Sequence, residues 1–161
     1  MTKDISYAEL LNQDLPLKSH PMYAVWREYA LASEKRGEEI ALFLERYGKL
    51  SGKDIMDVGC GDGGISISLA KKGARVTGID INQRVIERAK QRAIEEGVHV
   101  EWILKDVLDK DFHKRYDLII LYDIIEHILE VNIFARKISA LMNKNGLYIY
   151  IILTNYSRLI Y

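Results

Sequence analysis

A glycine-rich turn and a carboxylate one strand further on are the residues of this sequence best suited to chemistry. The turn lies within residues 57–63, and the carboxylate is Asp80. Glycines let the main chain approach a ligand closely, and a carboxylate at the end of the second strand can bind both ribose hydroxyls. The pattern predicts a site for an adenosine-bearing cofactor. The G-x-G-x-x-G spacing of Gly59, Gly61 and Gly64 also permits a dinucleotide, and a tight turn without a ligand is a third interpretation.

A second carboxylate, Asp57, favours one class of cofactor. It lies near the end of the first expected strand and is predicted to point toward the glycine turn. There it would repel a pyrophosphate and attract a cationic ammonium group, directly or through a water. The following helix has no Lys or Arg before Lys71, so no side chain there neutralises phosphates. Both features favour an adenosine cofactor without phosphates, S-adenosylmethionine, over NAD.

Positioning these residues requires strands and helices that alternate. Apolar segments typical of strands cover residues 55–58, 75–80, 98–104, 116–121 and 147–153. Helical patterns cover residues 65–72, 83–96 and 128–142, the last ending at Asn145-Gly146. Alternating βα units with short links predict a parallel sheet covered by helices. We expect an α/β fold, doubly wound and mostly parallel, with helices on both faces.

The amino-terminal third is predicted to differ from this core. Residues up to about Ser19 are expected to be an irregular leader, followed by two helices or one bent helix that ends near Tyr47. We therefore divide the chain into an N-terminal helical lid segment, residues 1–48, and a cofactor-binding core, residues 49–161.

Four motifs resemble those of the class I S-adenosylmethionine-dependent methyltransferases, over roughly residues 37–153. They lie in order at residues 57–63, 78–80, 105–107 and 116–128. The resemblance implies a Rossmann-like methyltransferase fold. Members usually add two strands after the fifth, and this sequence stops before them. We therefore expect a domain truncated at its C-terminus, with an exposed fifth strand that promotes dimerisation or aggregation.

The resemblance assigns cofactor roles to individual residues. The main chain at Gly59, Cys60 and Gly61 would lie against the methionine part, and Cys60 itself is expected to be a small packing residue. Asp80 would accept hydrogen bonds from the ribose hydroxyls; a plain strand-end carboxylate is the alternative. The main chain near Tyr122 would meet the cofactor's amino group.

Four further positions are implied for the cofactor's two ends. Ile81 would pack on the adenine face, Asp106 would accept the exocyclic amine, and the Val107 amide would donate to a ring nitrogen. A solvated acidic loop is the alternative for Asp106. Related enzymes often place a basic side chain such as Arg36 on the cofactor carboxylate, but its charged neighbours fit a solvated helix face equally well.

His127 is the candidate catalytic base. Methyl transfer to a hydroxyl needs proximity and a base, and a histidine is partly neutral at working pH. The Glu126-His127 pair resembles the small-molecule branch that includes ubiquinone-biosynthesis O-methyltransferases. A structural role, shaping the pocket or capping a helix, is the alternative. No metal site is expected, because the other histidines have no supporting ligands nearby.

The prolines that mark many amide N-methyltransferases after the fourth strand are missing here. The resemblance thus disfavours DNA or protein amides, leaves RNA open, and favours a small-molecule methyl acceptor. Lys and Arg total 23, as do Asp and Glu, so net charge gives no argument for nucleic acid or membrane partners.

The single cysteine and the absence of a signal-peptide pattern or a long apolar run predict a cytoplasmic protein without a membrane span. A non-catalytic module that keeps this fold and an NAD-dependent oxidoreductase fragment remain the alternatives.

Overall fold

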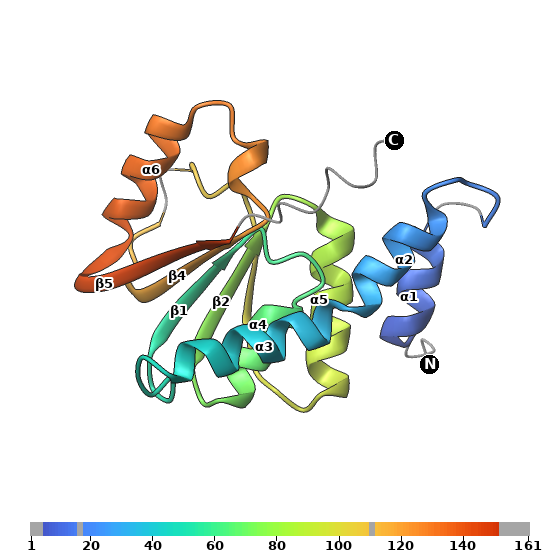
Figure 1. Ribbon diagram of the computed structural model, residues 1–161, viewed down its shortest axis with the longest axis horizontal. Coiled ribbons are helices and arrows are strands. Elements are labelled where there is room, and N and C mark those ends of the chain that lie inside the picture. Colours follow the sequence, from blue (N-terminus) through green and yellow to red (C-terminus); the bar gives the residue numbers. More distant parts are fainter. Residues whose placement is uncertain (1–4, 16–17, 110–111, 152–161) are drawn as a thin grey trace.

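A five-stranded parallel sheet forms the centre of the computed structural model, which describes residues 5–15, 18–109 and 112–151 (Figure 1). The strands are β1 (Asp54–Val58), β2 (Arg75–Asp80), β3 (Glu101–Leu104), β4 (Tyr116–Tyr122) and β5 (Met142–Ile151). Their order across the sheet is β3-β2-β1-β4-β5, and all four neighbouring pairs are parallel. This confirms the predicted doubly wound α/β fold, since the strand order reverses direction beside β1.

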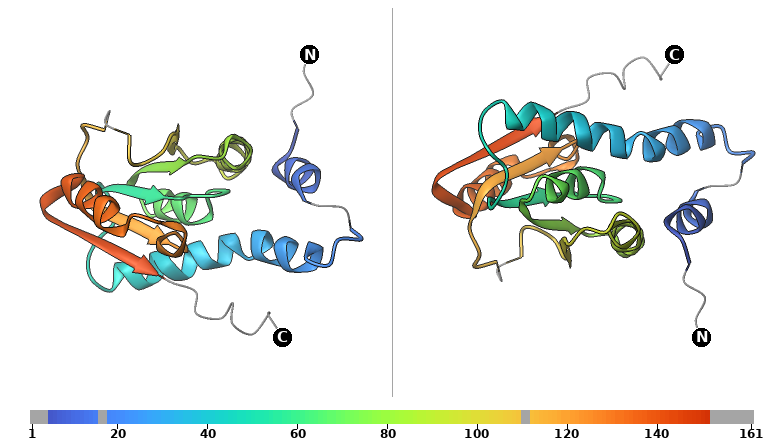
Figure 2. Two further views of the ribbon diagram at one scale, coloured as in Figure 1. Left: turned by 90° about the horizontal axis from the view of Figure 1, so that it is seen from above. Right: turned by 90° about the horizontal axis from the view of Figure 1, so that it is seen from below.

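Within the described ranges, six α-helices and one short 3-10 helix accompany the sheet. They are α1 (Tyr7–Asp14), α2 (Tyr23–Leu31), α3 (Ser33–Glu45), α4 (Gly64–Lys71), α5 (Gln83–Glu95), η1 (Ile125–His127) and α6 (Val131–Ala140). Figure 2 shows α2 and α3 following one another along one path, with α1 set apart beside α5.

Alternation along the strands divides the core between the two faces of the sheet. Ile55 of β1 packs with α3 and α4, whereas its neighbour Met56 packs with Phe134 and Ile138 of α6. Successive strand side chains point to opposite faces, so each central strand contributes to both clusters. The helices α3, α4 and α5 cover one face and α6 covers the other (Figures 1 and 2).

The expectation of an irregular leader up to about Ser19 is wrong, because α1 forms there. Ser6 caps this helix: its hydroxyl accepts a hydrogen bond from the Glu9 amide, and the Glu9 carboxylate accepts one from the Ser6 amide. This capping box satisfies two amides that a helix start otherwise leaves unpaired. Leu11 is buried, and α1 packs against α5.

Two predicted strand and helix starts also differ from the structure. The third strand starts at Glu101 rather than at residue 98, because the Val98 amide donates to the Ala93 carbonyl and extends the end of α5. The helix predicted over 128–142 covers only α6, since the Glu130 carbonyl accepts the Ile133 and Phe134 amides and so begins the helix at Val131.

The fifth strand begins earlier than expected. Met142 already pairs with Tyr116, and a register shift follows before Leu147 pairs with Leu118. Asn143 donates from its side chain to the Asp117 carboxylate at 2.8 Å, which anchors the irregular part of the strand. Asn145-Gly146 therefore lies inside an irregular strand and does not end a helix. Residues 152 and 153 of the predicted strand lie outside the described residues.

Candidate functional site

A cavity of about 230 Å³ opens where the strands β1 and β4 end, between the glycine turn and the helices α2, α3 and α5. This is the carboxyl edge of a parallel sheet, where open α/β folds bind ligands. Six residues predicted for the cofactor line it: Arg36, Asp57, Gly59, Cys60, Gly61 and Tyr122. The structure thus brings together residues that are up to 86 positions apart in the sequence (36 to 122).

Three positions of the glycine turn favour glycine because of their backbone conformation. Gly59, Gly61 and Gly63 have φ angles of 69°, 53° and 81°, which side-chain-bearing residues rarely adopt. The Gly59 and Cys60 amides both donate to the Ile79 carbonyl, at 2.8 and 3.1 Å, which ties the turn to β2. A Cβ atom on Gly61 would have no heavy atom within 4 Å, so the turn is open on that side, and Gly61 also lines the cavity.

Asp80 holds the turn from the side. Its Oδ2 accepts a hydrogen bond from the Gly61 amide at 3.0 Å, and its Oδ1 accepts one from the Asn82 amide at 2.9 Å. The half-buried carboxylate is therefore part of the support of the turn as well as a candidate ligand for hydroxyl groups. It does not line the 230 Å³ cavity itself.

Asp57 is an almost fully buried carboxylate on the cavity wall, only 1% exposed. Ser66 at the start of α4 donates its hydroxyl to the Asp57 Oδ2 at 2.6 Å. Burial raises the pKa of Asp57 to about 7, because removal from water disfavours the charged form, although the Ser66 hydrogen bond opposes this rise. A cationic group in the cavity would favour the ionised form.

A close crossing of α3 and α4 positions Arg36. A Cβ atom on Gly37 would lie 2.2 Å from the Gly64 carbonyl oxygen, and one on Gly64 would lie 2.1 Å from the Ser33 hydroxyl. Two glycines at the contact let the helix backbones approach, which brings the half-buried Arg36 to the cavity wall.

The predicted adenine-binding residues lie outside this cavity. The Ile81 side chain is 75% exposed, just beyond the end of β2. Asp106 is exposed, and its Oδ1 accepts a hydrogen bond from the Leu108 amide at 2.9 Å. Val107 is buried against the α6 side of the core. These residues follow the neighbouring strands β2 and β3, so they are close to Asp80 along the same sheet edge.

His127 lies at the end of η1, in the segment after β4, with an exposed side chain. Its amide donates to the Ile124 carbonyl at 3.0 Å, which closes the 3-10 turn. It is not among the residues that line the cavity. The structure therefore places His127 in the segment beyond the carboxyl end of β4 and outside the set of six residues that line the cavity.

Sequence reasoning assigned no site role to several residues that shape the cavity or its rim, among them Tyr7, Tyr29, Ser33, Asp62, Arg88 and Asp123. Asp62 accepts hydrogen bonds from Tyr7 at 2.5 Å and from Ser33 at 2.7 Å, so α1 and α3 both contact the turn. Arg88 of α5 lines the cavity and forms an ion pair with Asp14 of α1. Its buried Nε has no hydrogen-bond partner among the residues that the structure describes. A tyrosine or arginine on a helix gives no sequence signal for such long-range contacts.

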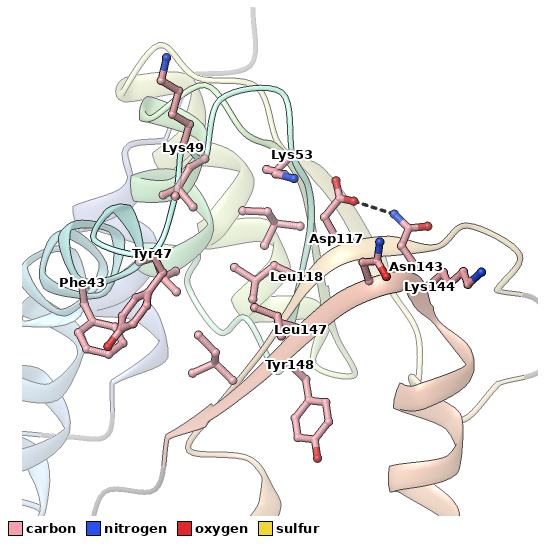
Figure 3. Close-up of a pocket in the computed structure, with 16 residues that line it drawn as sticks. Phe43, Tyr47, Lys49, Lys53, Asp117, Leu118, Asn143, Lys144, Leu147 and Tyr148 are labelled. Carbon is pink, nitrogen blue, oxygen red and sulfur yellow. Dashed lines mark hydrogen bonds between the residues drawn. The ribbon is translucent and has the colours of Figure 1, made fainter.

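A second cavity, of about 930 Å³, lies on the face of the sheet that α3 covers, near the amino ends of β1 and β4 (Figure 3). Phe43 of α3 and Tyr47 in the turn after it lie on one side, and Leu147 and Tyr148 of β5 lie on the other. Among the described residues, no helix is long and apolar enough to cross a membrane, and no group of three or more His, Cys, Asp or Glu side chains could hold a metal ion.

Comparisons with known proteins agree with this geometry. Residues 55–146 match the family described as a methyltransferase domain. The ubiquinone biosynthesis O-methyltransferases of Salmonella paratyphi A and Coxiella burnetii are each 34% identical to the chain, over 109 and 106 residues. The matches cover 66% and 65% of this chain but only 45% of either relative, so the chain spans about half the length of these relatives.

Solved structures share the fold. A Pyrococcus horikoshii protein is 30% identical with a TM-score of 0.69, covering 78% of this chain and 56% of that chain. The magnesium protoporphyrin IX methyltransferase of Synechocystis, solved with bound S-adenosylmethionine, has a TM-score of 0.66 at 23% identity, covering 84% and 66%. The family match covers more than half of the chain, and the parallel sheet has the same architecture as these structures. The chain therefore belongs to the methyltransferase-domain family.

Proposed function

We propose that this chain binds S-adenosylmethionine and is the cofactor-binding part of a methyltransferase that acts on a small-molecule acceptor. The observation that carries the proposal is the cavity at the glycine turn, where the carboxylate Asp57 and the guanidinium of Arg36 line one small space. An acid and an arginine complement the ammonium and carboxylate groups of an α-amino acid. Arg88 of α5 lines the same cavity and adds a second guanidinium to its wall.

Each part of the cofactor has residues that would hold it. Main chain at Gly59, Cys60 and Gly61 would lie against the methionine portion, with the main chain of Tyr122 near the amino group. Asp80 lies beside the turn, because its carboxylate accepts a hydrogen bond from the Gly61 amide. From there it would also accept hydrogen bonds from the ribose hydroxyls of a cofactor that lies against the turn.

The adenine would lie over the exposed strand ends beyond Asp80. We propose that Ile81, whose side chain is largely exposed, packs against its face. Asp106 would accept its amine and the Val107 amide would donate to a ring nitrogen. When bound, S-adenosylmethionine supplies a methyl group on a positively charged sulfur, which is ready for direct displacement by an acceptor.

The acceptor is proposed to be a small molecule with a hydroxyl group. Two relatives at 34% identity are named ubiquinone biosynthesis O-methyltransferases, and O-methylation requires removal of a hydroxyl proton. We propose His127 as the base, because its exposed side chain lies beyond β4 at the carboxyl edge of the sheet. RNA is a further possible acceptor, and DNA is not expected.

The helices before β1 are proposed to act as a lid over the cofactor, with residues 1–48 as the lid segment and residues 49–161 as the core. Tyr29, Ser33 and Arg36 from this segment already line the cavity. We further propose a cytoplasmic location, which suits a protein whose single cysteine is a buried thiol.

The chain is also proposed to form homodimers through β5. This strand lies at one end of the described sheet order, and Leu147 and Tyr148 on it are 65% and 53% exposed. An edge strand with apolar side chains favours pairing with another strand.

Calorimetric titration with S-adenosylhomocysteine, the demethylated product, tests the proposed cofactor. We expect binding to the wild type, no binding of NAD, and a loss of about a hundred-fold in affinity for Asp80→Ala, which removes two charge-assisted hydrogen bonds to the ribose. Asp80→Asn is a milder change, since its one amide oxygen can still accept the Gly61 amide while its NH2 group replaces the oxygen that accepts the Asn82 amide. We expect it to bind S-adenosylhomocysteine more tightly than Asp80→Ala but more weakly than the wild type.

Asp109→Asn, an exposed acid on the loop after β3, is the matched control and should bind as tightly as the wild type. Binding of NAD in place of S-adenosylhomocysteine would establish the oxidoreductase alternative. Binding of S-adenosylhomocysteine without methyl transfer from S-adenosylmethionine to any of a panel of small hydroxyl-bearing acceptors would support the non-catalytic module.

A further inference from the structure

Tyr29 bridges two charged groups of the cavity wall, Arg36 and Asp123, that lie far apart in the sequence. Its hydroxyl donates to the Asp123 Oδ2 at 2.9 Å, and the Arg36 Cζ lies 4.0 Å from the centroid of its ring. All three residues line the 230 Å³ cavity. They belong to α2, α3 and the residue directly after β4, so Tyr29 connects both helices to the sheet edge.

The backbone at Asp123 is unusual. Its φ angle is 55°, the left-handed region that favours glycine, and it is the one non-glycine residue with a positive φ among those the structure describes. Such a conformation costs free energy and persists where surrounding contacts fix it. The hydrogen bond from Tyr29 is such a contact, and it engages one of the two carboxylate oxygens.

The Tyr29 hydroxyl is suited to remain a donor. Burial raises its pKa, and the hydrogen bond to Asp123 raises it further, so the phenol stays protonated at neutral pH. The ring at the same time offers its face to a guanidinium, an arrangement that is stronger when partly desolvated. One side chain therefore orients an anion and a cation.

We propose that Tyr29 is a positioning residue that holds Arg36 and Asp123 as a paired clamp for the amino-acid end of the cofactor. In this arrangement Arg36 receives the ligand carboxylate, and Asp123 joins Asp57 in receiving the ammonium group. The clamp makes the site selective for adenosine thioethers that carry an intact α-amino acid. The inference rests on the proposed function, since it concerns the same cavity.

Two ligands test it. S-Adenosylhomocysteine carries the amino-acid end, whereas 5'-methylthioadenosine keeps the adenosine and the sulfur but lacks that end. Tyr29→Leu removes both the ring face and the hydroxyl, and we expect it to weaken S-adenosylhomocysteine binding by about ten-fold or more. Affinity for 5'-methylthioadenosine should change by less than about two-fold, which is within the scatter of neutral substitutions.

Tyr29→Phe separates the two contacts of the side chain. It keeps the ring under Arg36 and loses the bond to Asp123, so we expect an intermediate loss, confined again to S-adenosylhomocysteine. Tyr47→Leu is the matched control: Tyr47 is an exposed tyrosine at the end of α3, on the other cavity, and its loss should leave both affinities unchanged.

Equal losses for both ligands would overturn the clamp and assign Tyr29 a merely structural role, and so would unchanged binding of S-adenosylhomocysteine to Tyr29→Leu. A wild type that binds 5'-methylthioadenosine as tightly as S-adenosylhomocysteine would also overturn it while leaving the cofactor class intact. A wild type that binds neither ligand would overturn the proposed function itself. Thermal unfolding of each variant shows that the fold is retained, and Tyr29→Phe keeps the test decisive if Tyr29→Leu fails to fold.

Discussion

Asp57 is a residue whose burial disfavours its charged form and whose position beside the cavity suits it to bind a cationic group. It is buried next to the glycine turn, and its carboxylate accepts a hydrogen bond from the Ser66 hydroxyl. A carboxylate in such a position keeps its proton up to about pH 7. An ammonium group in the adjoining cavity would compensate for the burial of the charge, because opposite charges at short range favour both ionised forms.

The pH dependence of stability tests this residue. The folded-state pKa of Asp57 lies above its ordinary value, so the folded chain binds more protons than the unfolded chain between about pH 4 and pH 7. Its contribution to the free energy of unfolding therefore falls as pH rises through that window. Each pKa unit corresponds to about 1.4 kcal/mol, which gives a loss of up to about 4 kcal/mol.

Asp57→Asn removes this titration but keeps an acceptor for the Ser66 hydroxyl. In the absence of ligand, urea unfolding should show the variant gaining stability relative to the wild type as pH increases from 5 to 8. Between pH 5 and pH 8 the variant should also bind S-adenosylhomocysteine more weakly than the wild type does. A variant that is less stable than the wild type by the same amount at both pH values would contradict the argument.

Helix packing is the next scale, and here the contact of α3 with α4 decides the geometry of the site. Gly37 and Gly64 meet at the contact, and Ser33 and Arg36 on the same helix lie against the glycine turn and cavity. The helix α1, fixed by its capping box, adds contacts to the turn through Tyr7 and Asp62. The helices before β1 thus contribute side chains to the site as well as covering the sheet.

Gly37→Ala tests this crossing. The new Cβ would lie 2.2 Å from the Gly64 carbonyl oxygen, so the helices must separate. Overpacking of this kind costs about 1–3 kcal/mol, partly offset by the better helix propensity of alanine. We expect a lower unfolding free energy in urea and weaker S-adenosylhomocysteine binding, since Arg36 moves with α3.

The neighbouring Glu38→Ala serves as the control, because Glu38 is exposed on the same helix. It should leave both quantities within about 0.5 kcal/mol of the wild type. Unchanged ligand affinity in a destabilised Gly37→Ala would show that the crossing supports the fold but does not position Arg36.

At the scale of the whole molecule, the two cavities lie at different parts of the sheet and differ in the side chains that line them. The carboxyl edge of β1, β2 and β4 carries the cofactor-type cavity and the charged residues around it. The edge strand β5 and the end of α3 instead border the wider cavity, which is lined by exposed apolar side chains.

Sedimentation at several concentrations tests the proposed pairing through β5. The wild type should associate as concentration rises, and Leu147→Lys with Tyr148→Lys should reduce association, because charged side chains on edge strands oppose pairing. Leu104→Lys on β3, the strand at the other end of the sheet order, is the matched control and should not affect it. Association that persists in the double variant would exclude β5 as the interface.

Local patterns were sufficient for much of this protein. The order of strands and helices, the glycine turn, and the placement of Asp57 and Asp80 beside it follow from periodicity and from residue types that few conformations tolerate. The capping box of α1 was equally local and readable, but the weak apolar pattern of that segment concealed it. The end of α5 and the irregular start of β5 depended on main-chain bonds and strand pairing that sequence patterns do not encode.

Only the tertiary structure decided which side chains share the cavity. Tyr29 and Asp123 are 94 residues apart, and their contact exists because α2, α3 and β4 pack around the same sheet edge. Likewise, the depth at which Asp57 is buried, and hence the direction of its pKa shift, depends on the helix that covers β1. Sequence determines which groups are available, whereas long-range packing sets the distances and the solvent exposure that give them their chemistry.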